Sequence, residues 1–257
     1  MNIDTHIADR FLNRETIIQE EDKWLFPSLR TADGRRTEVV AELKKRTLRC
    51  IENFPSFNRS LFTGLFPQLR EKQKEITVHL VVGSSAATYK VHNEQGIHLI
   101  IDLLQVADLT PIVSQMMYVI ENYLHFETAL YCIETVHGKP QAQMDYQSML
   151  NYQAFTQGLA TYLAWNGDNN TYCFSQPKYE ETRERSFGML YEAFQSKEPL
   201  LQRKILASLP KLSFWNQFPM ISVLFYLDDR YHENGNQGII TFYQNGWEHV
   251  ISSIFEL

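Results

Sequence analysis

The chain has 257 residues, of which 44% are hydrophobic and 21% charged, a balance typical of a globular protein with one large domain or two small ones. Thirty Asp and Glu against 24 Lys and Arg give a formal net charge of −6, which argues against nucleic-acid binding. Three widely spaced cysteines favour neither a disulfide framework nor a thiolate zinc site. Since no apolar run would suit a signal peptide or a membrane-spanning helix, we expect a cytoplasmic protein that does not bind membranes.

The first 75 residues are predicted to form a helical layer. Residues 38–51 repeat apolar side chains at helical spacing, and residues 60–70 are expected to form a second short helix. The pattern then changes, because segments 76–82 and 96–103 are rich in β-branched residues and a turn signal separates them. With a third strand at 88–92, these segments predict a small antiparallel sheet.

The chain after Asp108 is predicted to be helical. Thr110 and Pro111 form a helix start signal, a hydroxyl N-cap followed by proline, for a helix that runs to about Ile133. Later helices are expected at 146–165, with a polar stop signal at 167–170, and at 179–196, 199–209, 213–232, 237–244 and 247–255. The sequence thus predicts a mostly helical α+β fold, in which residues 76–257 form a domain with a small sheet followed by a helical bundle.

Two of these helical segments carry a resemblance to a known family. Residues 119–126 read VIENYLHF, and residues 155–162 read FTQGLATY. Together they resemble the two active helices of the gluzincin zinc metallopeptidases, in which a HExxH helix is followed by a helix with an EGLAxY-like sequence. The resemblance extends over residues 76–257, since residues 96–102 resemble the strand at the sheet edge beside the family's cleft and residues 218–255 resemble its closing helices.

The resemblance implies positions for a zinc site. In the family, the two histidines and the downstream glutamate bind zinc, and the glutamate within HExxH is the general base. With His125 set on the second histidine, Glu121 takes the first histidine position, Asn122 takes that of the general base and Gln157 replaces the downstream glutamate. All these metal and catalytic positions except His125 are therefore changed.

The replacements have predictable chemical consequences. Glu121 and His125 lie four residues apart, on one helix face, where they can approach a common metal. A tight zinc site needs three protein ligands, and Gln157 offers only a neutral amide oxygen. Asn122 cannot accept a proton from a metal-bound water, so general-base catalysis, typically worth about 100- to 10,000-fold, would be missing. We therefore expect neither a bound cofactor nor an intact catalytic residue.

Other interpretations of the same residues stay open. A second register keeps Glu121 as the general base but places Ile120 and Leu124 at the ligand positions, so that no metal-activated water would lie beside the base. Glu121 and His125 would also suit an ordinary ion pair on a helix surface. Gly158, next to Gln157, would suit a helix that packs closely against another.

We expect the protein to act by binding a protein or peptide, as a catalytically inactive relative of the metallopeptidases. The predicted contact is strand addition at residues 96–102, where Gly96, His98 and Ile100 mark the edge, and where His98 would face either solvent or a cleft. One alternative is a hydrolase that holds a divalent metal other than zinc with Glu121 and His125. Another is a structural subunit of a larger assembly. The sequence does not predict the oligomeric state.

Overall fold

The chain divides by its internal contacts into two compact units. The first contains residues 1–59 and 66–128, and the second contains residues 60–65 and 129–257. The computed structural model describes residues 1–30, 36–94, 96–140, 143–165, 174 and 176–256, so the expected stop signal at 167–170 lies outside the described residues. Helix α6 (Val113–His137) runs from the first unit into the second.

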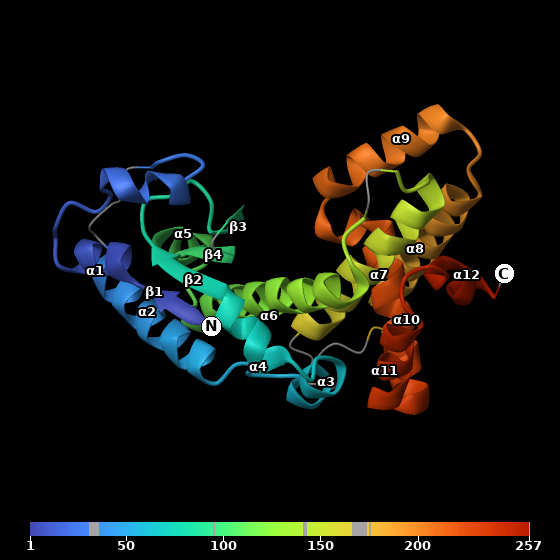
Figure 1. Ribbon diagram of the computed structural model, residues 1–257, viewed down its shortest axis with the longest axis horizontal. Helices are drawn as coiled ribbons and strands as arrows, with labels where there is room; N and C mark the ends of the chain where they lie inside the picture. The colour runs from blue at the N-terminus through green and yellow to red at the C-terminus, as the bar shows by residue number, and fades with distance from the viewer. Residues whose placement is uncertain (31–35, 95, 141–142, 166–173, 175, 257) are drawn as a thin grey trace. The chain divides into compact units, whose positions relative to one another are not determined.

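The first unit contains a four-stranded sheet whose strand order is β1-β2-β4-β3 (Figure 1). Its strands are β1 (Asn2–Asp4), β2 (Ile76–Val81), β3 (Thr88–Asn93) and β4 (Gly96–Asp102). The three expected strands are confirmed, but the prediction of an antiparallel sheet was wrong. Strand β2 pairs in parallel with both β1 and β4, and only β3 and β4 are antiparallel. The reason is that β3 does not pair with β2. Instead, β4 lies between them, antiparallel to β3 and parallel to β2.

Strand β1 explains why the first unit differs from the expected division at residue 75. Asn2 lies opposite Thr77 and Asp4 lies opposite His79, so residues from both sides of that position share one sheet. Figure 1 shows this pairing as the blue strand β1 beside the turquoise strand β2. A three-residue strand is too short for a recognisable alternation, and the sequence pattern did not predict it.

One face of the sheet is covered by the N-terminal segment, which contains α1 (His6–Leu12) and the 3-10 helix η1 (Glu20–Leu25). Val81 and Ile100, from neighbouring strands, pack with Ile7, Leu25 and Phe26 in a buried apolar cluster. Because side chains alternate along a strand, the other face carries the alternate residues of β2 and β4, and five of these are also fully buried. These residues are Ile76, Val78, Leu80, Leu99 and Ile101.

The remaining helices of the first unit are α2 (Thr37–Glu52), α4 (Leu69–Lys72), the 3-10 helix η3 (Gln73–Glu75) and α5 (Leu103–Leu109). The helix expected at 38–51 is confirmed as α2, which buries an apolar stripe that includes Val40 and Leu43. Helix α5, which the sequence pattern did not predict, follows β4 directly. The buried carboxylate of Asp102 caps it by accepting hydrogen bonds from the N–H groups of Leu104 and Gln105, each at 2.9 Å.

The second unit is helical in all its described elements. They are α3 (Arg59–Leu65, from Ser60 on), α7 (Tyr146–Ala164), α8 (Pro177–Gln195), α9 (Pro199–Ser208), the 3-10 helices η4 (Leu209–Lys211) and η5 (Phe214–Asn216), α10 (Phe218–Asn234), α11 (Asn236–Asn245) and α12 (Val250–Phe255). The helices predicted from the sequence are confirmed within a few residues at their ends. There are two exceptions. The helix expected at 60–70 is divided into α3, which ends at Leu65, and α4, which begins at Leu69, and at 213–232 η5 precedes a helix that begins at Phe218.

Helices α7 and α10 pack closely at Gly158. A Cβ atom at this position would overlap with the Cβ and Cγ1 atoms of Val223 and approach the main-chain oxygen of Met220 to 3.3 Å. The interpretation of Gly158 as a residue for close helix packing is therefore confirmed.

Candidate functional site

Helix α6 carries three of the four residues that the resemblance assigned to a metal site. His125 is 0% exposed and lies one helical turn after Glu121. Its ring stacks on Phe57, with 3.7 Å between ring centroids, and lies 4.5 Å from the ring of Phe54. The imidazole is therefore enclosed by aromatic side chains from the segment after α2.

Main-chain groups engage both ring nitrogens of His125. The Nδ1 atom lies 2.7 Å from the carbonyl oxygen of Glu121, and the N–H group of Ser56 donates to Nε2 at 3.2 Å. Since a carbonyl only accepts, Nδ1 carries the proton and Nε2 supplies the lone pair. Burial lowers the pKa of His125 to about 4, so the ring is neutral near pH 7.

This arrangement is unsuited to metal binding. A histidine ligand must direct a ring lone pair at the metal, and the Nε2 lone pair of His125 already accepts from Ser56. The ring contacts the main-chain oxygen of Glu121, so the expected surface ion pair with the Glu121 carboxylate is wrong. Among the described residues, no group of three or more His, Cys, Asp or Glu side chains could hold a metal ion.

The other positions of the predicted site have different surroundings. Burial raises the pKa of the half-buried Glu121, and the charge of Glu121 adds to the effect of burial on the thiol of Cys50, whose pKa rises to about 11. Asn122 is half-buried on α6, whereas Gln157 is half-buried on α7, in the second unit. Ile120 and Leu124, the ligand positions of the second register, are fully buried apolar residues.

Strand β4 is not the sheet edge that was predicted to bind a peptide. It pairs with β2 on one side and with β3 on the other, so Gly96, His98 and Ile100 lie in an inner strand. His98 is only 5% exposed, and both of its ring nitrogens have partners within the protein. Its Nδ1 atom lies 2.9 Å from Nε2 of His79, and its Nε2 atom lies 2.9 Å from Oδ1 of Asn93. The prediction was wrong because β1 and β3 form the edges.

The outer edge of β3 presents main-chain groups at every second residue. The N–H group of Asp102 donates to the carbonyl oxygen of Ala87 at 2.8 Å, which identifies this pair as hydrogen-bonded. Because hydrogen-bonded and non-hydrogen-bonded pairs alternate in an antiparallel ladder, the main-chain groups of Thr88, Lys90 and His92 point away from β4. No strand among the described residues pairs with this side of β3.

A polar network that the sequence pattern did not reveal joins the N-terminal segment to the sheet. His6 bonds Asp4 through Nδ1 and the buried Asp22 through Nε2, the latter at 2.7 Å, and Asp4 lies 3.1 Å from Nδ1 of His79. His79 in turn bonds His98. Burial disfavours the charged form of His6, but its hydrogen bonds with Asp22 and Asp4 outweigh this effect and raise its pKa. The network links the N-terminal segment to the sheet, because its histidine rings form hydrogen bonds with one another and with the two carboxylates.

Comparisons with protein-family models, with curated proteins and with solved structures find no match for this chain. No helix in the described part of the chain is both long and apolar enough to cross a membrane. The ring of His125 and the outer edge of β3 are therefore the two places in the first unit whose geometry bears on function.

Proposed function

We propose that this protein acts by binding an extended peptide segment and that it does not catalyse zinc-dependent hydrolysis. The observation that carries the proposal is the outer edge of β3, where the main-chain groups of Thr88, Lys90 and His92 point away from the sheet. An extended peptide can pair with such an edge through its own main-chain hydrogen bonds. The enclosed, neutral ring of His125 supports the absence of a zinc site.

Contacts with side chains of α6 hold the edge strand β3 in place. The hydroxyl of Tyr123 on α6 donates to the carbonyl oxygen of Tyr89, and Lys90 forms an ion pair of 2.7 Å with Glu127. Because these contacts fix the position of β3, a peptide would pair with a strand that is already ordered. A lysine on an edge strand also has a simpler role, because its charge discourages unwanted pairing. The experiment must therefore separate strand pairing from charge.

A proline substitution makes this separation. Lys90→Pro removes an N–H group that points away from β4, so the ladder within the sheet should persist while one outward donor is lost. Lys90→Ala removes the same ion pair with Glu127 and keeps the N–H group. Peptides selected from a phage library of random sequences against the wild-type chain should bind Lys90→Ala and lose at least about tenfold in affinity for Lys90→Pro.

Three results would contradict the proposed function. If the library yields no binder, or if binders tolerate Lys90→Pro as well as Lys90→Ala, the β3 edge is not the binding site. If the chain instead retains zinc after purification and cleaves peptides until a chelator is added, the protein is a zinc-dependent hydrolase. In that case Glu121→Gln should abolish both zinc content and cleavage.

A further inference from the structure

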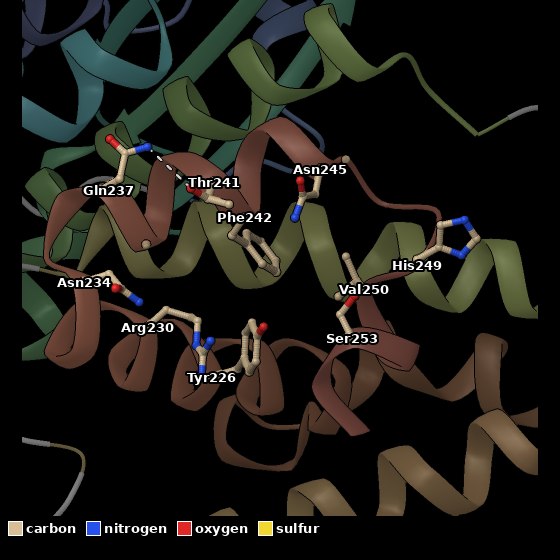
Figure 2. A pocket seen from close by; sticks show the side chains of 12 residues that line it. Tyr226, Arg230, Asn234, Gln237, Thr241, Phe242, Asn245, His249, Val250 and Ser253 are labelled. Atoms are coloured by element: carbon tan, nitrogen blue, oxygen red, sulfur yellow. Dashed lines mark hydrogen bonds between the residues drawn. The ribbon is translucent and has the colours of Figure 1, made fainter. Parts of the chain in front are cut away.

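The second unit contains a pocket of about 420 Å³ between α10 and α11 (Figure 2). Its volume falls in the range of roughly 300–1,000 Å³ that is usual for small-molecule sites. All of its lining residues belong to this unit, including His249 and Ser253 at the end near α12. The pocket is therefore separate from the β3 edge, which belongs to the first unit.

Two rows of polar side chains form the long walls of the pocket. One row lies on α10 and the other on α11, each with members four residues apart and therefore on one helix face. The rows consist of Tyr226, Arg230 and Asn234, and of Gln237, Thr241 and Asn245. Gly238 sets the narrow spacing of the helices, because a Cβ atom there would overlap with the carbonyl oxygen of Arg230.

The pocket lining is basic. Its basic side chains are those of Arg230 and His249, and none of the described residues that line it carries a carboxylate. The guanidinium group of Arg230 lies over the ring of Tyr226, 5.2 Å from the ring centroid, in a cation–π contact that restricts the orientation of the group. One of its nitrogens pairs with Glu233 at 2.8 Å.

Glu233 is a weak competitor for an anionic ligand. Its side chain is 52% exposed and lies one helical turn from Arg230, and exposed pairs of this kind contribute little to stability. A carboxylate or phosphate group matches the N–H edge of a guanidinium better, because it can accept two hydrogen bonds at once. Around it, the side chains of Asn234, Gln237 and Asn245 offer both donors and acceptors, which suit hydroxyl groups.

We propose that this pocket binds a small anionic molecule with a hydroxyl-rich body, its carboxylate or phosphate group held by Arg230. The aromatic side chains of Tyr226 and Phe242 provide apolar surface for the carbon skeleton of the ligand. Sugar acids and sugar phosphates are the class of compound with this combination of charge and hydroxyl groups.

Four probes separate the parts of the proposal by isothermal titration calorimetry on the full chain. Gluconate carries both the anionic group and the hydroxyl-rich body, glucose is neutral, glucosamine is cationic and inorganic phosphate lacks the body. Gluconate should bind at least about tenfold more tightly than each of the other three. No binding of gluconate, or equal binding of glucose or of phosphate, would overturn the proposal.

Variants of opposite expected sign make the test independent of folding. Arg230→Gln should weaken gluconate binding at least about tenfold, while Glu233→Gln should strengthen it several-fold by removing the competing carboxylate. Arg203→Gln, an exposed arginine on α9 outside the pocket lining, is the matched control and should bind as the wild type does. Unchanged affinity in Arg230→Gln, or weaker binding in Glu233→Gln, would contradict the assignment of Arg230.

Discussion

Burial and main-chain hydrogen bonds make His125 a core residue of the first unit. A free histidine side chain titrates near pH 6.5 and can serve as an acid, a base or a ligand. Here Phe54 and Phe57 exclude water from the ring, and the carbonyl of Glu121 and the N–H of Ser56 fix one tautomer. A histidine that the sequence resemblance assigned to a zinc ligand thus has a structural role that its neighbours in the sequence do not reveal.

The neutral state of His125 predicts a pH dependence of stability. The unfolded chain binds a proton at this residue near its ordinary pKa of 6.5, whereas the folded chain does so only near 4. The contribution is therefore fully present above pH 6.5 and is lost as the pH falls from 6.5 to about 4. In urea denaturation over this interval, His125→Gln should show a flatter dependence of the free energy of unfolding on pH.

Asn122→Ala is the matched control for this measurement. It changes a neighbouring side chain on α6 and removes no titratable group, so the free energy of unfolding should keep the wild-type dependence on pH. Equal slopes for the wild type and His125→Gln would mean that His125 titrates in the folded chain as it does in the unfolded one.

At the scale of elements, one helix pair shows how packing overrides intrinsic propensity. Alanine is favoured over glycine inside a helix by about 1 kcal/mol. At Gly158 the nearby Val223 on α10 leaves no room for a methyl group, while at Gly188 on α8 no atom lies within 4 Å of the Cβ position. The same substitution in two helices of one unit should therefore act in opposite directions.

The expected results for this pair follow from overpacking and propensity. Gly158→Ala should lower the free energy of unfolding by about 1–3 kcal/mol, because α7 and α10 must separate or distort. Gly188→Ala should raise it by up to about 1 kcal/mol. Urea denaturation of both variants measures the difference, and a neutral or stabilising Gly158→Ala would show that α7 and α10 lie further apart than in this structure.

At the scale of the whole molecule, the chain consists of two contact units that share α6. Units with separate cores can open separately, and amide hydrogen exchange reports such local opening. Gly158→Ala removes favourable packing within the second unit, so exchange should accelerate in α7 and α10. Exchange in β2 and β4 of the first unit should stay at the wild-type rate. An equal acceleration in the strands would mean that the units unfold together.

Local patterns were sufficient to predict most helices and three strands. Helical spacing of apolar residues predicted α2, and the helix expected from Pro199 begins at that residue as α9. The seven-residue helices α1 and α5 and the three-residue strand β1 were missed because few residues carry their pattern.

The sequence by itself determined which residues share a helix, so it placed Glu121, Asn122 and His125 together on α6. Only the tertiary structure decided their chemistry, because the groups that enclose His125 come from residues 54–57, about 70 positions earlier in the chain. The same holds for the edges of the sheet. Residues 2–4 pair with β2, and β4 lies between β2 and β3, so the edge strands are β1 and β3. Contacts between distant segments leave no periodic signal in the sequence, whereas helical neighbours three and four residues apart do.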